Sequence, residues 1–141
     1  MKYSVAIFSL VLWLAGCDKG ANPSSASPVD TTLRLVLLKP AGGETYHVGD
    51  SVPLSFEYRN SSNTVHFVTL WFSPDNGKSW DMPVFINSIH YTGARKDTVW
   101  VIPADTTYGS YVSDSAKIKV EDYADKATVY GFNAQPFRIL P

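Results

Sequence analysis

The sequence predicts an all-β fold in which about seven short strands pack as a sandwich within one domain, residues 33–141. Three observations favour this fold. Short apolar runs alternate with polar residues at a period of two, as in half-buried strands. Gly, Pro, Asn and Asp interrupt these runs at fairly regular spacing. No apolar pattern of period 3.6, which a helix requires, persists for more than a turn or two.

The first two expected strands lie on either side of a glycine-rich turn. Leu33–Leu38 ends before Pro40 and the Gly42-Gly43 pair. Ser51–Tyr58 follows with strict alternation, which places four apolar side chains on one face: Val52, Leu54, Phe56 and Tyr58. Pro53 lies early in this strand, and its missing N–H is expected to face an edge or solvent.

The third expected strand, Val65–Phe72, is the most apolar run of the chain. Its alternation places Val68, Leu70 and Phe72 on the face toward the core. Phe67, Thr69 and Trp71 are then expected on the opposite face. If that second face is covered or the register is reversed, Trp71 belongs to the core instead.

Four further strands complete the expected set: Val84–Ile89, Thr98–Ile102, Ala116–Glu121, and a last one with Phe137 and Ile139. Seven short strands in about 100 residues are typical of immunoglobulin-like or fibronectin-III-like β-sandwiches. Cys17 is the only cysteine, so the chain has no internal disulfide. The disulfide of antibody domains is therefore absent, and the fibronectin-like variants fit better.

Residues 1–16 have the pattern of a secretory signal peptide, with Lys2 ahead of the apolar run Val5–Leu14. The run is too short to cross a bilayer, which takes about 20 residues. Leu14-Ala15-Gly16-Cys17 resembles the lipobox of bacterial lipoproteins. The resemblance implies cleavage before Cys17, acyl chains such as palmitate on that residue, and a membrane-anchored place in the bacterial cell envelope, periplasmic or cell-surface. The alternative is an ordinary signal peptide with a chance cysteine.

Residues 17–32 join this anchor to the domain. After Cys17 they read DKGANPSSASPVDTT, a composition rich in Ser, Pro, Ala and small polar residues. Such a composition does not bury a core, and it predicts a flexible tether.

The stretch SPDNGKSW, Ser73–Trp80, resembles the Asp box of sialidases, Ser-x-Asp-x-Gly-x-x-Trp. Gly77 suits the positive φ of a tight reversal, and the side chains of Ser73 and Asp75 suit hydrogen bonds to nearby backbone N–H groups. Trp80 then returns to cover the hairpin. Every residue of the motif is explained by folding, so it predicts a structural turn and not a sialidase site.

A second resemblance covers nearly all of residues 33–141. The opening LLKPAGGETYHVGDSVPLSFEY is followed by the SPDNGKSW turn, Ile102-Pro103, the run AKIKVED from Ala116, and a final element containing Tyr130, Phe132, Phe137 and Ile139. In this order the motifs resemble the small Ig-like domain of the Ser-Thr-rich anchored proteins of yeast cell walls, linked to β-glucan assembly. Asn133-Ala134 departs from the family's Ser-Asp. The resemblance implies a non-catalytic module without a fixed ligand.

The remaining polar residues suggest neither an enzyme nor a cofactor. His47, His66 and His90 lack metal-ligand spacing, so they are expected to be solvated or capping residues and no metal is predicted. The carboxylates of Glu121, Asp122 and Asp125 suit a calcium ion, but they lack the D-x-[DN]-x-[DN]-G order of a calcium loop, which favours an ordinary polar loop after a strand. No catalytic or nucleotide-binding signature is present. The formal net charge of −1 with scattered basic residues indicates no nucleic-acid partner.

The aromatic side chains are the best candidates for function. Trp71, Trp80, Tyr91 and Trp100 are expected to present flat faces to a ligand, either a cell-wall polysaccharide or an envelope protein. The chain is thus interpreted as a binding or accessory module of the envelope. The alternative is an assembly subunit that joins other envelope proteins through an exposed strand edge or an apolar patch.

Overall fold

The computed structural model of the protein describes residues 32–104 and 107–141. The expected signal peptide, Cys17 and nearly all of the tether lie outside them. The described residues are all-β and contain no helix. Their ten strands are β1 (Arg34–Lys39), β2 (Thr45–His47), β3 (Ser51–Arg59), β4 (Val65–Ser73), β5 (Met82–Pro83), β6 (Ile89–Thr92), β7 (Arg95–Val101), β8 (Ser113–Asp122), β9 (Tyr130–Phe132) and β10 (Phe137–Leu140).

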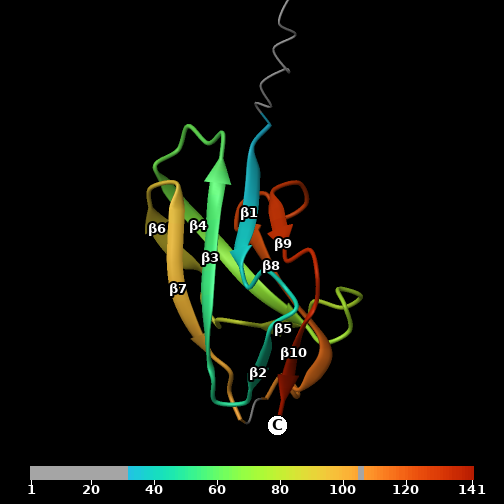
Figure 1. Cartoon of the computed structure of the whole chain (residues 1–141). Coiled ribbons are helices and arrows are strands. Elements are labelled where there is room, and N and C mark those ends of the chain that lie inside the picture. The colour runs from blue at the N-terminus through green and yellow to red at the C-terminus, as the bar shows by residue number, and fades with distance from the viewer. Residues whose placement is uncertain (1–31, 105–106) are drawn as a thin grey trace, which may run out of the picture.

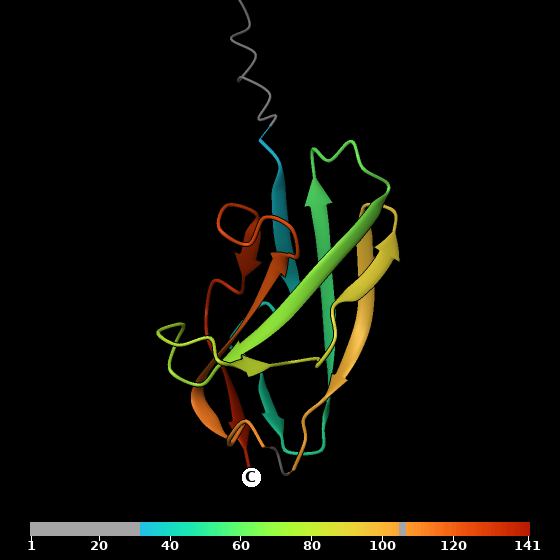
Figure 2. The same ribbon diagram turned by 180° about the vertical axis from the view of Figure 1, so that it is seen from behind.

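Two sheets of unequal width make up the described fold. The small sheet has the order β1-β3-β7. The large sheet has the order β2-β10-β8-β4-β5, with β6 also paired to β4 and β9 to β8. β1, β3 and β7 lie in front in Figure 1, and β4 and β8 lie in front in the reverse view of Figure 2. The all-β prediction is therefore confirmed, with three more short strands than the seven expected.

The core lies between the two sheets and follows the predicted alternation. β3 contributes Val52, Leu54 and Phe56, each no more than 1% exposed. β4 contributes Val68, Leu70 and Phe72, while Phe67 on the opposite face is 49% exposed. The predicted register of β4 is confirmed. Burying one such side chain contributes about 1.5–3 kcal/mol, so this alternation fixes which face of β4 is inside.

Pro53 shows why a proline is tolerated in the central strand of the small sheet. The Tyr58 N–H donates to the carbonyl oxygen of Ala94, the residue just before β7 (2.8 Å). Even-numbered residues of β3 therefore point their N–H groups toward β7. Pro53 therefore faces the β1 side. The pairing of β1 with β3 stops at Ser55, so no described strand needs a donor from Pro53.

The expected strand Val84–Ile89 is wrong. Only Ile89 is in a strand, as the first residue of β6, and residues 84–87 form bends. The Val84 N–H reaches Leu70 O (3.0 Å), but Ile86 is then 81% exposed. An apolar run alone does not show whether a partner strand lies alongside.

Candidate functional site

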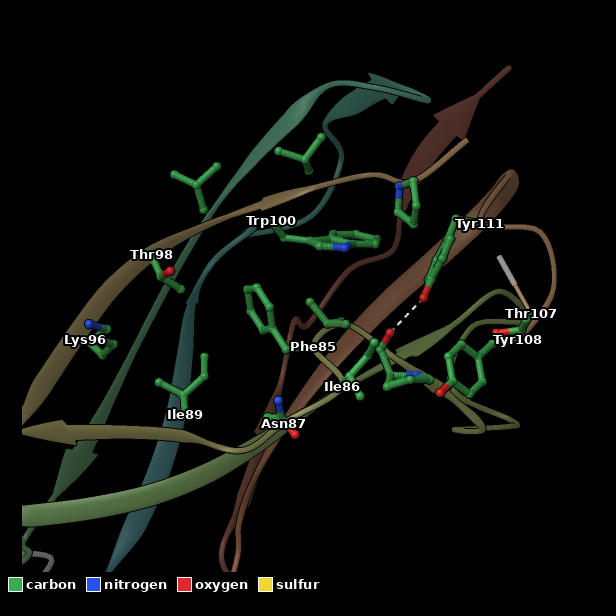
Figure 3. A pocket seen from close by; sticks show the side chains of 15 residues that line it. Phe85, Ile86, Asn87, Ile89, Lys96, Thr98, Trp100, Thr107, Tyr108 and Tyr111 are labelled. Atoms are coloured by element: carbon green, nitrogen blue, oxygen red, sulfur yellow. Dashed lines mark hydrogen bonds between the residues drawn. The ribbon is translucent and has the colours of Figure 1, made fainter. Parts of the chain in front are cut away.

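Two of the four predicted contact residues, Tyr91 and Trp100, are buried. Tyr91 is 5% exposed, and its ring centroid lies 5.6 Å from that of Phe56. Trp100 is 3% exposed and packs against Phe72 (5.8 Å) and Tyr111 (5.2 Å). The expectation that these two rings present open faces is wrong, because both lie on the inward face of their strands. Trp100 instead lies beside a groove, where Figure 3 shows its ring between Phe85 and Tyr111.

The predicted turn residues form one hydrogen-bonded unit. Ser73 Oγ donates to Asp75 Oδ1 (2.7 Å), which also accepts from the Ser79 N–H (2.9 Å) and the Lys78 N–H (3.0 Å). The Gly77 N–H donates to Ser73 Oγ (2.8 Å). The hydrogen bond from Ser73, followed by the one from the Ser79 backbone, lowers the pKa of the Asp75 carboxyl to about 2. Asp75 therefore holds this turn as a carboxylate.

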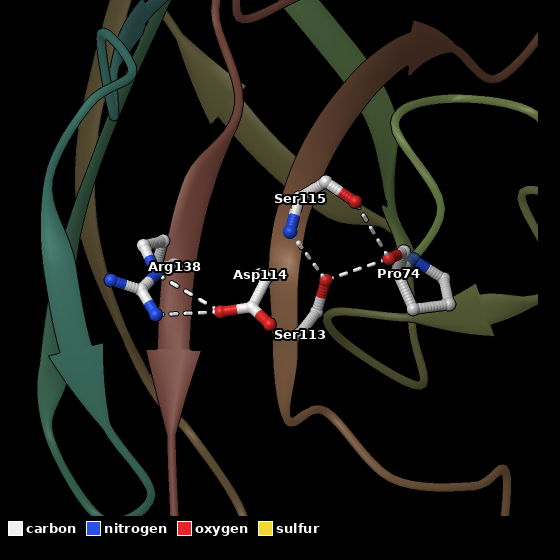
Figure 4. Close-up of polar contacts among 5 residues, drawn as sticks. All are labelled: Pro74, Ser113, Asp114, Ser115 and Arg138. Atoms are coloured by element: carbon white, nitrogen blue, oxygen red, sulfur yellow. Dashed lines mark hydrogen bonds and ion pairs between the residues drawn. The ribbon is translucent and has the colours of Figure 1, made fainter.

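The turn is attached to the first residues of β8. Ser113 Oγ donates to Pro74 O (2.6 Å), and Ser115 Oγ reaches the same oxygen (3.4 Å), as Figure 4 shows. The Asn76 N–H donates to Ser115 O (2.9 Å). These bonds fix the turn against the large sheet and so set the position at which Trp80 returns.

Trp71 and Trp80 lie on the outer face of the large sheet, together with residues of β8 and β9. Lys119 on β8 is opposite Trp71 on β4 and opposite Phe132 on β9. Trp80 lies over the same place, with its ring centroid 6.4 Å from that of Phe132. Together they form what we call the aromatic–lysine face: Trp71, Trp80, Tyr130, Phe132, Lys117, Lys119 and Lys126.

Lysines and aromatic rings alternate across this face. Lys119 Nζ lies 5.2 Å from the Trp80 ring centroid, and Lys117 Nζ lies 5.5 Å from that of Phe132. Phe132 is 47% exposed and Tyr130 46%. A hollow of about 290 Å³ is lined by Trp80, Lys119, Lys126, Tyr130 and Phe132. Flat rings with ammonium groups beside them suit a ligand that has both apolar C–H surface and negative charge.

Glu121 fixes the Trp71 end of the face. Glu121 Oε1 accepts hydrogen bonds from Trp71 Nε1 (2.7 Å) and Thr69 Oγ1 (3.1 Å), and Oε2 lies 2.9 Å from Lys119 Nζ. Burial alone raises the pKa of the Glu121 carboxyl, but the bonds from Lys119, Trp71 and Thr69 outweigh it and hold the pKa below its ordinary value. Trp71 is therefore a half-buried ring whose position is fixed by this hydrogen bond. It is neither fully exposed on the outer face nor part of the core, the two alternatives that the sequence left open.

Asp122 and Asp125 accept hydrogen bonds from neighbouring groups, and of the three histidines His47 and His90 are exposed as expected whereas His66 is buried. Asp122 accepts from Tyr58 Oη and from the Ala124 N–H, whereas Asp125 accepts from Thr128 Oγ1. In the described residues no three side chains of metal-ligating type converge. His66 is 4% exposed and stacks on Tyr58 at 4.0 Å, so the expectation that it is solvated or capping is wrong. Burial lowers its pKa.

Sequence reasoning missed Tyr130, Phe132 and the three lysines as site residues. The alternation from Ala116 to Glu121 places Lys117 and Lys119 outward, so the sequence was enough to predict which face of β8 carries them. The pairing of β8 with both β4 and β9 was not, because it joins segments about 50 and 13 residues away along the chain (Trp71↔Lys119, Lys119↔Phe132).

Comparison with known proteins identifies no family. No family model matches the chain, and no curated protein matches it significantly. The solved structure of Pseudomonas fluorescens alkylpurine DNA glycosylase AlkC bound to DNA containing an abasic site analog matches at a TM-score of 0.31 and 15% identity. The match covers 78% of this chain and 29% of that one. A likeness this distant indicates neither a family nor a function. Among the described residues, none forms a helix long and apolar enough to cross a membrane.

Proposed function

We propose that the protein is a non-catalytic, lipid-anchored binding module of the bacterial cell envelope, and that its aromatic–lysine face holds an acidic polysaccharide. The observation that carries the proposal is the convergence of three aromatic rings, Trp80, Tyr130 and Phe132, with three lysines: Lys117 and Lys119 from β8, and Lys126 from the segment between β8 and β9. The lipobox-like residues Leu14–Cys17 supply the anchor in this proposal, on the periplasmic or the cell-surface side.

The aromatic rings support the choice of a polysaccharide. Sugar rings present flat C–H surfaces that stack on exposed aromatic side chains, and two such rings, Tyr130 and Phe132, lie nearly parallel at 17° with centroids 6.3 Å apart. Trp80 borders the same hollow of about 290 Å³. This volume is just below that of typical ligand pockets, which measure about 300–1,000 Å³, so the site suits one short segment of a chain molecule.

The lysines support an acidic ligand. Lys117 and Lys126 have no carboxylate within ion-pair distance in the described residues, whereas Lys119 is paired with Glu121. Two ammonium groups are thus available for carboxylate groups of a uronic-acid polymer. Such exposed pairs contribute little affinity each, about 0–1 kcal/mol, but they discriminate between charged and neutral polymers.

The strand order supports an immunoglobulin-like domain of the fibronectin-like kind. The small sheet has three strands, β1-β3-β7, whereas the corresponding sheet of constant-type antibody domains has four. Domains of this kind act through loops or sheet faces, and the aromatic–lysine face is such a surface.

The proposal is tested with one polymer in two charge states. The full chain is titrated with polygalacturonate and with the same polymer fully methyl-esterified, and affinity is measured by calorimetry or affinity electrophoresis. We expect binding to polygalacturonate that falls at least tenfold in Trp80→Ala and Phe132→Ala, the equivalent of about 1.4 kcal/mol. Lys126→Gln and added salt should weaken it as well, since salt screens exposed charges.

Tyr108→Ala is the matched control, because Tyr108 is 50% exposed but lies away from this face. Equal binding of both polymers contradicts the acidic specificity. Binding that is unchanged in Trp80→Ala and Phe132→Ala contradicts the proposed face. The absence of binding to these polymers and to peptidoglycan contradicts the polysaccharide proposal and leaves a protein ligand for this surface.

A further inference from the structure

The two edges of the small sheet are not equally protected. At the β1 edge, the backbone of β9 approaches so closely that a Cβ added at Gly131 would clash with Leu35 O. At the other edge, no described strand pairs with the outer side of β7. A free strand edge presents unpaired N–H and C=O groups that can pair with another chain.

The register of β7 shows which backbone groups face outward. The Ile102 N–H donates to Asp50 O (3.0 Å), and Ile102 O accepts from the Gly49 N–H (2.9 Å), so even-numbered residues of this segment bond toward β3. Val99 is opposite Pro53, which has no N–H to offer. The N–H and C=O groups of Asp97, Val99 and Val101 therefore point to the free edge, since successive residues of a strand alternate.

An apolar groove of about 1090 Å³ runs along this edge. One wall is β7 and the other is the bent segment 83–89, and the rings of Trp100 and Tyr111 form part of the lining, as Figure 3 shows. Tyr111 Oη donates to Pro83 O (2.7 Å), which ties the two sides together at one end. Ile86 is 81% exposed in the wall, and Val99 and Val101 are 54% and 57% exposed on β7.

Charges divide β7 into two halves. Arg95 and Asp97 form an ion pair of 2.9 Å, whereas residues 98–101 are uncharged. Among the described residues, Lys96 is the one charged side chain that lines the groove, and it forms no ion pair with any of them. Natural edge strands are usually blocked by charges, prolines or bulges, and residues 98–101 have none of these.

We propose that the free edge of β7 binds an extended peptide segment of a partner protein, which adds as a fourth strand to the small sheet. Its alternate apolar side chains fill the groove over Trp100, and an acidic residue at one end pairs with Lys96. Only a polypeptide has donors and acceptors that repeat at the spacing of the groups on Asp97, Val99 and Val101, about 6.8 Å for every two residues. A glycan or a lipid chain leaves these groups unpaired.

The inference is independent of the polysaccharide proposal, because the linings of the groove and of the 290 Å³ hollow share no residue. The probe is an array of synthetic hexapeptides in which Thr alternates with Val, Leu, Ile or Phe, with Glu at either end. Binding to the full chain is measured by fluorescence polarisation. We expect the best peptides to bind with a Kd below about 1 mM.

Val99→Pro is the decisive variant, because it removes an outward N–H that the fold itself does not use, and edge strands accept proline. Its control, Val99→Thr, keeps the N–H and the β-branched shape. We expect Val99→Pro to weaken peptide binding at least tenfold and Val99→Thr to change it less than threefold. Both variants should retain far-UV circular dichroism and polygalacturonate binding.

A second measurement does not depend on the folding of a variant. The best peptide is methylated on every second amide nitrogen, in two alternative sets with the same side chains. One set should abolish binding and the other should preserve it, since only one row of amides faces β7. The proposal is overturned if no peptide binds with a Kd below about 1 mM, or if both methylated sets bind alike. It is also overturned if sedimentation shows that the free chain is a dimer and that Val99→Pro dissociates it. That result would assign the edge to a second copy of the chain.

Discussion

Asp75 organises the turn at residues 73–80 through its carboxylate. Its Oδ1 accepts two backbone N–H groups and the Ser73 hydroxyl, and its Oδ2 accepts the Ser79 hydroxyl (2.9 Å). These bonds lower its pKa from 3.8 to about 2. A pKa below the unfolded value means that the carboxylate stabilises the fold fully above about pH 4, and that this stabilisation is lost as the pH falls toward 2.

Asp75→Asn is therefore expected to lower the urea midpoint of unfolding at pH 7, because the amide cannot accept the same set of donors. The difference from the natural protein should shrink as the pH is lowered from 4 to 2, where the carboxylate of the natural protein becomes protonated. Urea titrations at pH 7, 4 and 2.5 test this. Asp81→Asn, at an exposed residue just beyond the turn, is the control. A difference that stays constant over this pH range contradicts the role of the charge.

The roles of the turn residues were predictable because the turn is local in sequence. Ser73, Asp75 and Gly77 serve the purposes that their side chains and φ preferences indicate, and Gly77 has a φ of +85°. The bonds from Ser113 and Ser115 to Pro74 O were not predictable, because they come from a strand about 40 residues later.

At the scale of the strand, β4 separates the interior from the aromatic–lysine face. Phe72 is fully buried, and its ring lies 4.9 Å from that of Tyr111. Phe67 is 49% exposed and stacks on His90 at 4.6 Å. The two phenylalanines lie on the same strand, so their replacement separates the effect of burial from that of strand propensity.

Phe72→Ala is expected to lower the free energy of unfolding by about 3–5 kcal/mol, because it removes a core ring and leaves a cavity. Phe67→Ala should cost less than about 1 kcal/mol, as for an exposed contact. Chemical denaturation of both variants at neutral pH provides the measurement. Similar costs for the two replacements would mean that the described register of β4 is wrong.

The strands with strict alternation, β3, β4 and β8, were predictable, because a one-residue slip would place their apolar side chains in water. The region between β4 and β7 was not. Val84–Ile89 is apolar enough for a strand, yet it forms the bent wall of the groove, and the pairing of β6 begins only at Ile89. The burial of Tyr91 follows from this pairing, so its inward position was equally hidden. Trp100 is different, because it alternates with the buried Ile102 along the expected strand Thr98–Ile102, and its inward position could have been predicted from that alternation.

At the scale of the molecule, β10 joins distant parts of the chain. It pairs in parallel with β2, where Arg138 is opposite Thr45, and antiparallel with β8. Phe137 and Ile139 on β10 are both fully buried. β2 has no other strand partner among the described residues.

Deletion of residues 137–141 is thus expected to abolish cooperative folding. Loss of the two buried side chains alone costs about 5–10 kcal/mol, which is comparable to the whole stability of a small domain, about 5–15 kcal/mol. Thermal unfolding followed by circular dichroism should show no transition, whereas deletion of the exposed Pro141 alone should change the midpoint little. A cooperative transition in the longer deletion would show that the rest of the large sheet folds without β10.

The chain enters the fold at one end of the sandwich, above β1, and leaves it at the opposite end, after β10, as Figures 1 and 2 show. The aromatic–lysine face and the groove along β7 are separate surfaces, and the linings of their two hollows have no residue in common. Two ligands bound at these surfaces at once would be joined to each other through one domain. If both proposed ligands bind, the domain connects an envelope polysaccharide on one surface to a peptide strand of a partner protein on the other.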